Sequence, residues 1–332
     1  MKKIVLINFL VFVLLLFLSE LIAMMYVIGS RIYQMNNNML LDRHKNNVFQ
    51  YIIGTYFDKN NFYHYDVLLD KMRFINNKEL KKSSIILFGC SVTYGNLLDD
   101  KNNFSGILSR ITKKAVYNMA FDGWGPAHML KQLNENKSLL FLDDPEYIIY
   151  TFIKDHKRRL FFYQGWGFDS QLYWRYVINK DDDCLYPVKR KYPLYYRFYI
   201  VKMIQHTIEN IKLRNEKLID KYLLRIFEES VFIIKNRWPK AKLVMLVYND
   251  ELCENSKDAE LYKTENALTM YEQEKIKEMG FEIINIEELA GKSFCGAEYH
   301  ARCPIYGDLD KNHPSSKMWE EFVPKLVEKL NM

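Results

Sequence analysis

The 332-residue sequence predicts an α/β protein whose core is a parallel β-sheet with helices on both faces. Three observations support this prediction. Short apolar runs of strand length recur five times after residue 83. Longer segments with helical character separate these runs, and glycine, proline or acidic residues mark several of the boundaries. Consecutive parallel strands require crossover connections of this kind, so the alternation itself indicates a parallel sheet.

The predicted strands share a nearly continuous apolar character, which is typical of central strands that are buried on both faces. They cover Ile85–Phe88, Val116–Met119, Tyr147–Ile153, Leu243–Tyr248 and Phe281–Ile286. We favour one domain over residues 83–332 rather than two small domains, because two candidate site motifs lie at opposite ends of this region.

Helical patterns follow the strands. The first reaches Ile111, and the others cover Pro126 to about Leu139, Ile200–Asn236, Glu260–Met279 and about Ser315–Leu330. Pro126 suits the first position of a helix. Gly280 suits the left-handed residue that closes one. Pro324 is expected to kink or divide the last helix, because proline has no N–H for the helical hydrogen bond.

Residues from about 155 to 200 interrupt the alternation. They are rich in tyrosine, phenylalanine, tryptophan and basic residues. We interpret this segment as an insertion that covers or extends a site.

The N-terminus predicts a membrane anchor over residues 1–29. Lys2 and Lys3 precede an uncharged run from Ile4 to Ser19, and the apolar pattern resumes after Glu20. Together the two pieces approach the roughly 20 residues that a membrane-spanning helix needs. A cleaved signal peptide and a buried helix are the alternatives. The two lysines favour a cytoplasmic N-terminus and a body outside the cytoplasm. Residues 30–82 are polar and are expected to form a stalk with a short irregular or β lead-in.

Charge and cysteines restrict the classes of partner. The formal charge of +6 is mild, and no nucleic-acid motif accompanies its richest patch, so no nucleic-acid partner is expected. Cys295 and Cys303 are plausible disulfide partners in an oxidising compartment, and Cys90 is then expected as a buried thiol. The cysteines lack metal-ligand spacing with histidine, so neither a metal nor another cofactor is expected.

Two short motifs predict the chemistry. Gly89-Cys90-Ser91-Val92-Thr93-Tyr94-Gly95 follows the first predicted strand, and Asp310-Lys311-Asn312-His313-Pro314 precedes the last helix. Serine is a weak nucleophile at neutral pH and needs an imidazole to accept its proton, and the imidazole needs a carboxylate to orient it. Ser91, His313 and Asp310 are therefore a candidate catalytic triad. Taken singly, each motif also fits an ordinary helix-capping loop.

These motifs resemble those of the SGNH (GDSL-like) hydrolase superfamily, and the resemblance covers roughly residues 83–330. It implies a flavodoxin-like three-layer αβα sandwich with a five-stranded parallel sheet. It also implies that Ser91 is both the nucleophile and a backbone oxyanion donor. The segment Asn118–Pro126 is similar to the glycine block of the family, which makes Gly123 the second backbone donor.

The third motif departs from the family pattern. An asparagine usually follows the third strand, whereas this chain has Lys154, His156, Arg158 and Arg159 in the following segment. Lys154 or His156 is a candidate replacement donor to the oxyanion. Trp124, Arg158 and Arg159 are candidate substrate-binding residues, with a surface role as the alternative for the two arginines.

The sequence therefore predicts a serine esterase or acyltransferase acting outside the cytoplasm. O-acyl groups of cell-envelope carbohydrate, especially O-acetyl groups, are the preferred substrate, because aromatic side chains stack on sugar rings. Lipid esters and thioesters are the alternative substrates. A non-catalytic glycan-binding or scaffold protein of the same fold is an alternative function, and a membrane-anchored structural protein with coincidental motifs is another.

Overall fold

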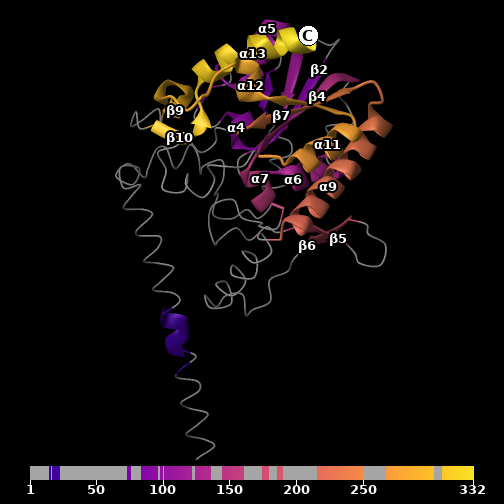
Figure 1. Ribbon diagram of the computed structural model, residues 1–332, viewed down its shortest axis with the longest axis vertical. Helices are drawn as coiled ribbons and strands as arrows, with labels where there is room; N and C mark the ends of the chain where they lie inside the picture. The colour runs from indigo at the N-terminus through magenta and orange to yellow at the C-terminus, as the bar shows by residue number, and fades with distance from the viewer. Residues whose placement is uncertain are drawn as a thin grey trace, which may run out of the picture. The chain divides into compact units, whose positions relative to one another are not determined.

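The computed structural model describes the parts of the chain that form the sheet and its covering helices (Figure 1). The described residues are 15, 17–22, 73–75, 84–95, 98–99, 101–121, 124–135, 144–160, 174–178, 185–189, 215–249, 267–302 and 309–332. The chain divides into two compact units, residues 1–60 with 189–215 and residues 61–188 with 216–332. All predicted site residues belong to the second unit.

A six-stranded sheet with strand order β1-β3-β2-β4-β7-β8 forms the centre of the second unit. Strands β3, β2, β4, β7 and β8 are parallel, and β1 pairs antiparallel with β3 at one edge. The strands are β1 (Arg73–Ile75), β2 (Ser84–Phe88), β3 (Ala115–Asn118), β4 (Pro145–Ile153), β7 (Lys242–Tyr248) and β8 (Phe281–Asn285). The five predicted parallel strands are thus confirmed, and part of the predicted lead-in contributes β1.

The helices around the sheet are α4 (Ser91–Tyr94), α5 (Phe104–Thr112), α6 (Pro126–Glu135), α7 (Asp155–Arg158), α9 (Glu216–Arg237), α11 (Met270–Glu278), α12 (Ile286–Ala290) and α13 (Ser316–Leu330). The described residues also form two small two-stranded ribbons: β5 (Trp174–Ile178) with β6 (Leu185–Lys189), and β9 (His300–Arg302) with β10 (Leu309–Pro314). The first ribbon falls within the predicted insertion. The 3₁₀ turn Ala297–Tyr299 leads into β9.

The single helix predicted after the serine motif was wrong, because the chain forms two helices there. Gly95 ends α4 in a left-handed conformation with φ of 80°. A Cβ at this position would lie 2.4 Å from the Cβ of Asn103, so the chain turns too closely for any other residue. Asn103 then caps α5 by accepting a hydrogen bond from the Gly106 N–H.

Two other helices differ from the sequence prediction, one in its start and one in its continuity. Helix α11 begins at Met270 rather than Glu260, since Thr269 and Glu272 form a capping box at its start. Residues 260–266 lie outside the described residues. Gly280 follows this helix with φ of 105°, which confirms its predicted closing role. Helix α13 continues through Pro324 and is not divided, because Pro324 lies on the exposed side, where water can solvate the carbonyl without a partner.

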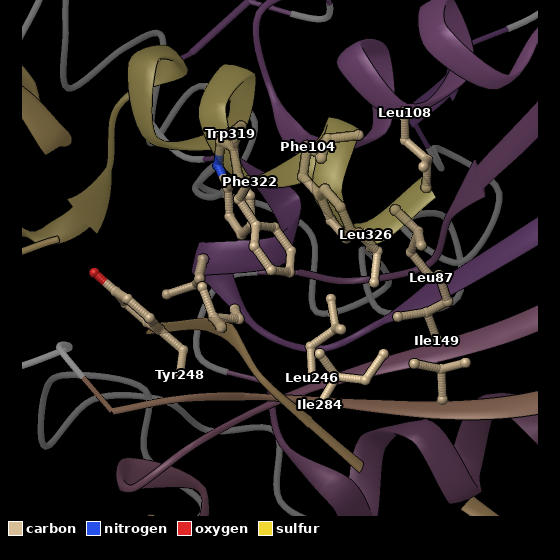
Figure 2. Packing of buried hydrophobic residues seen from close by; sticks show 14 of the residues in the cluster. Leu87, Phe104, Leu108, Ile149, Leu246, Tyr248, Ile284, Trp319, Phe322 and Leu326 are labelled. Atoms are coloured by element: carbon tan, nitrogen blue, oxygen red, sulfur yellow. The ribbon is translucent and has the colours of Figure 1, made fainter. Parts of the chain in front are cut away.

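Helices cover both faces of the sheet and make three layers. Helices α5, α12 and α13 pack together on one face, and α6, α9 and α11 pack together on the other (Figure 1). Figure 2 shows the core of the first face, where side chains from α5 and α13 meet the alternating residues of the strands. Its fully buried members include Leu87, Phe104, Ile149, Leu246, Trp319 and Phe322. On the second face, the Phe227 ring of α9 contacts Tyr150, Phe152 and Phe281.

The predicted anchor and disulfide lie mostly outside the described residues. Helical residues are described between 15 and 22, and no described helix is long and apolar enough to span a membrane. The rest of residues 1–29 and most of the predicted stalk lie outside the described residues. Cys90 is a buried thiol and Cys295 is disulfide-bonded. Cys303 lies outside the described residues, so its pairing with Cys295 stays a prediction.

Candidate active site

The strand order indicates at which edge of the sheet a ligand site is expected, before any side chain is considered. Along the chain, the parallel strands run outward from β2 to β3, return to β4 on the other side of β2, and continue to β7 and β8. Open parallel sheets of this flavodoxin-like order bind ligands beyond the carboxyl ends of the two strands where the direction reverses. Those strands are β2 and β4. The serine motif follows β2, and the motif that departs from the family pattern follows β4.

Ser91 is the first residue of α4, directly beyond the end of β2. Cys90 precedes the helix in an extended conformation. The N–H of a first helical residue has no partner inside its own helix, so the Ser91 N–H is suited to an external acceptor. The side chain is largely buried, with 5% of the residue surface exposed. Its position at the start of a helix that follows a central strand therefore fits a nucleophile at the carboxyl edge of the sheet.

Gly89 sets the path of the chain into this turn. Its φ is 154°, and a Cβ there would lie 2.2 Å from Thr93 Oγ1 and 3.3 Å from the carbonyl oxygen of Thr151. Thr93 belongs to α4 and Thr151 to β4, so the glycine lets β2, α4 and β4 approach closely. Any side chain at this position would displace the serine turn.

His313 lies on a strand that is adjacent to the serine helix. Strand β10 pairs antiparallel with β9, and the register shifts between Asp310 and Pro314. This irregular stretch contains His313, which is half-buried. Helix α4 and β10 lie side by side, with Cα atoms of the two elements within 8 Å. Folding thus brings together two segments that are more than two hundred residues apart in the sequence.

The structure describes the backbone but not the side chain of Asp310, which pairs with Ala301 in the β9–β10 ribbon. Hydrogen bonds fix the end of the ribbon to the start of α13. The Ser315 N–H donates to the Tyr299 carbonyl at 2.8 Å, and the Ser315 hydroxyl donates to the Glu298 carbonyl at 2.8 Å. The Ser–His–Asp assignment itself stays a prediction that this arrangement permits.

The glycine block lies between β3 and α6. Gly123 falls outside the described residues, but both sides of it are described. The Trp124 N–H donates to the Phe121 carbonyl at 3.2 Å, which links the described residues on the two sides of Gly123. Trp124 is 7% exposed and stacks on His128, so it is packed into the protein rather than presented as a substrate-binding surface.

Asn118 connects the glycine block to the serine turn, a role that the sequence reasoning missed. Its side-chain amide donates to the Thr93 carbonyl at 2.9 Å and to Ser105 Oγ at 3.2 Å. Its side-chain carbonyl accepts from the Ala120 N–H at 3.1 Å. A polar residue that ends an apolar strand was the available signal.

Two partly exposed aromatic rings lie near the serine. Tyr94 is three residues after Ser91, which places it on the same side of α4. Its ring meets that of Phe121 edge-on, with centroids 5.4 Å apart. Both residues are half-buried. The serine and glycine motifs therefore each contribute one ring to this aromatic contact.

The two candidate replacement donors after β4 differ in exposure. Lys154 is half-buried at the end of the strand. His156 is fully buried, and its Nδ1 is 2.9 Å from the hydroxyl of Tyr150. Burial, assisted by the nearby Arg159 charge, lowers the pKa of His156 well below its usual value, so the imidazole is neutral. The ring of His156 therefore does not reach solvent, whereas Lys154 is partly exposed.

The two arginines after β4 were candidates for substrate binding, with a surface role as the alternative. The side chain of Arg158 lies outside the described residues. Arg159 is only 8% exposed, and its guanidinium donates to Asp155 Oδ2 and to the Trp124 carbonyl, each at 2.6 Å. Arg159 is therefore held within the protein, and the structure gives it a role other than surface contact with substrate.

Lys157 of the segment after β4 belongs to a charged cluster with Glu272 and Asp220. Lys157 Nζ donates to Glu272 Oε2 at 2.7 Å, and Glu272 is fully buried. Asp220 of α9 lies near this carboxylate. Burial, the Glu272 charge and a hydrogen bond with Glu272 raise the pKa of Asp220 to about 6. Among the described residues, no group of three or more histidine, cysteine, aspartate or glutamate side chains is arranged to hold a metal ion.

This chain is similar to known proteins in structure, and comparisons of its sequence find no match. No family model and no curated protein matches the chain. A G-D-S-L family lipolytic protein from Desulfitobacterium hafniense DCB-2 is 7% identical, with 74% of this chain and 99% of that chain covered and a TM-score of 0.41. The lipase Lip_vut3 from a goat rumen metagenome is 12% identical over 74% and 97% of the two chains, with a TM-score of 0.45.

A third similar structure is the acetyl xylan esterase Est2A from the rumen bacterium Butyrivibrio proteoclasticus. It is 11% identical over 76% of this chain and 64% of that chain, with a TM-score of 0.37. Identities and scores of this size carry no conclusion about activity. The α/β fold of this chain instead rests on its own strand order and layers.

Proposed function

We propose that this chain is a serine esterase or acyltransferase of the SGNH type. One observation carries the proposal: α4, which begins at Ser91, lies beside β10, which contains Asp310 and His313. Both elements belong to the second unit, in whose strand order ligands are expected beyond the carboxyl ends of β2 and β4. A serine and a histidine on neighbouring elements at such an edge supply the nucleophile and the base that acyl transfer needs.

In the proposed reaction, the Ser91 hydroxyl attacks the carbonyl carbon of an ester while His313 accepts its proton. Asp310 orients the imidazole and stabilises its charged form. The N–H groups of Ser91 and Gly123 stabilise the oxyanion. His313 then returns the proton to the departing alcohol, which leaves an acyl-serine. Water or a second alcohol attacks this ester, with His313 again accepting and returning a proton.

We propose O-acyl groups of carbohydrate, in particular O-acetyl groups, as the substrate class. The partly exposed rings of Tyr94 and Phe121 beside the serine helix support this choice, because aromatic rings pack well against the apolar faces of sugars. We also propose that the N-terminal apolar run anchors the protein in a membrane, with the catalytic unit outside the cytoplasm. Fractionating cells that express the full chain, followed by protease treatment from outside, tests the anchor and its orientation.

Covalent labelling with a serine-directed phosphonate tests the catalytic proposal. The wild-type protein should acquire one label, located on Ser91 by mass spectrometry. Ser91→Ala should lose the label, and His313→Ala should react far more slowly. Ser293→Ala is the matched control, since Ser293 is an exposed serine outside the proposed site. A wild-type protein that is folded but is not labelled at Ser91 would contradict the proposal.

A second function is supported by the segment after β4. The family asparagine is absent there, and removal of one oxyanion donor costs about 10²- to 10³-fold in rate. A non-catalytic glycan-binding protein of the same fold would tolerate that loss. Calorimetric titration with acetylated and deacetylated oligosaccharides separates the two functions. Binding without turnover, unchanged in Ser91→Ala, would support the binding protein.

A further inference from the structure

Arg159 connects the turn after β4 to the loop of the glycine block. Its Nε donates to Asp155 Oδ2 at 2.6 Å, one helical turn earlier in α7. Its Nη1 donates to the Trp124 carbonyl at 2.6 Å. The guanidinium therefore joins two segments that follow different strands of the sheet, β4 and β3, at the edge where the site is proposed.

The guanidinium of Arg159 is buried, so its hydrogen bonds to Asp155 and Trp124 are held in fixed directions. The side chain is 6% exposed, and that of Asp155 is 20% exposed. A buried guanidinium is tolerated when its charge is paired and its donors are satisfied. Asp155 supplies the charge, and the planar guanidinium then points another donor at the Trp124 carbonyl. Lysine, with a single ammonium on a flexible chain, cannot hold both acceptors with the same geometry.

The loop is held on its other side as well. The Gly125 N–H donates to His128 Nδ1 at 3.2 Å. Burial, with the charges of Arg159 and Lys131, lowers the pKa of His128 to about 3, so the imidazole is neutral and can accept this bond. A Cβ on Gly125 would lie 3.3 Å from the Arg159 Cβ, which shows how closely the two segments pack. Arg159 and His128 thus fix the backbone directly after Gly123.

We propose that Arg159 is a positioning residue that aligns the glycine-block loop so that its backbone N–H can stabilise the oxyanion. This inference rests on the proposed esterase function. Arg159 does not touch substrate in this proposal. It acts through the Trp124 carbonyl, and Asp155 acts through Arg159. The buried clamp then supplies rigidity to an oxyanion site in which the usual asparagine is absent.

Steady-state kinetics with p-nitrophenyl acetate test the inference. Misplacement of a reacting group by about 1 Å can cost about 10²-fold in rate. We expect Arg159→Lys and Asp155→Asn to lower kcat by about 10- to 100-fold, with KM changed by less than about threefold. Arg225→Lys is the matched control, because Arg225 also bonds a carboxylate four residues away, at a half-buried position of α9 outside the proposed site. It should leave kcat and KM unchanged.

Chemical rescue separates positioning from a general loss of structure. Arg159→Ala leaves space for a guanidinium ion beside Asp155, so millimolar methylguanidinium should restore part of kcat in this variant. It should not accelerate the wild-type enzyme. Thermal unfolding shows at which temperatures each variant is folded, and the rates are compared at those temperatures. If Arg159→Ala does not fold, Arg159→Lys and Asp155→Asn still decide the outcome.

The outcomes distinguish this inference from the function on which it rests. Failure of the phosphonate to label wild-type Ser91 would overturn both. A labelled wild-type enzyme whose Arg159→Lys and Asp155→Asn variants keep full kcat would overturn only the positioning role. A rise in KM with constant kcat would also overturn it and would assign Arg159 to substrate binding.

Discussion

Lys157 and Glu272 form a 2.7 Å ion pair although 115 residues separate them in the sequence. Glu272 is fully buried, and the same carboxylate oxygen accepts the Thr269 N–H at 2.6 Å. The pair joins α7, which follows β4 at the proposed site, to the first turn of α11. One carboxylate thus caps a helix and secures the segment beyond the central strand.

Removal of Lys157 should therefore lower the free energy of unfolding substantially. Lys157→Met leaves the Glu272 charge buried without its cation, and breaking a buried pair in this way costs about 3–5 kcal/mol. Urea unfolding at neutral pH measures the loss. Lys275→Met is the control, because its Glu278 partner is exposed and such surface pairs contribute about 0–1 kcal/mol. The double variant Lys157→Met/Glu272→Gln should recover stability, and an equal loss in Lys157→Met and Lys275→Met would contradict the prediction.

Asp220 should make stability depend on pH. Its pKa is raised to about 6 in the folded protein, above the ordinary value of 3.8. The folded state therefore prefers the protonated carboxyl, and this contribution to stability is lost as the pH rises from about 4 through 6. Asp220→Asn should be more stable than wild type above pH 6, and the difference should shrink toward pH 4. A difference that stays constant across urea titrations in this range would exclude Asp220 as the titrating group.

Substitution of Gly89 should damage the serine turn. In Gly89→Ala the new methyl group would meet Thr93 Oγ1 and the Thr151 carbonyl. We expect phosphonate labelling of Ser91 to fall at least about tenfold, because small displacements of a reacting group are expensive. Gly291→Ala is the matched control, since Gly291 is also left-handed, with φ of 68°, but has open space around it. Similar labelling rates in the two variants would show that the close approach at Gly89 is unimportant.

Phe121 should contribute to binding of the substrate rather than to the chemical step. Phe121→Ala removes one ring of the Tyr94–Phe121 pair beside the serine helix. For acetylated sugars we expect KM to rise several-fold with kcat nearly constant, since an interaction equal in ground state and transition state affects KM alone. Phe232→Ala, on the exposed surface of α9, is the control. An unchanged KM, or an equal change for p-nitrophenyl acetate, would argue against a sugar-binding surface here.

The sequence predicted the strands well, for a physical reason. Central parallel strands are buried on both faces, so their residues form continuous apolar runs that are visible without a partner. Helix boundaries were harder to predict from the sequence. The separation of α4 from α5 depends on the close contact between Gly95 and Asn103, and the continuity of α13 depends on the exposed location of Pro324. Neither feature can be seen in a single sequence.

The same limit applies to the candidate site. Ser91 and His313 were identified because their motifs have recognisable local spacing. The supporting contacts of Asn118 and Arg159 join residues that follow different strands. Spacing alone cannot reveal such partners. Arg159 was a candidate for substrate contact, whereas its guanidinium is buried against Asp155 and the Trp124 carbonyl.

The β9–β10 ribbon determines how the esterase activity is expected to respond to heating. The histidine of the proposed triad belongs to a two-stranded ribbon outside the six-stranded sheet, whereas the serine follows the sheet's buried β2 strand. Small ribbons open with less free energy than a central sheet. Esterase activity should consequently disappear at a lower temperature than the circular dichroism of the body, with full recovery on cooling as long as the sheet has remained intact.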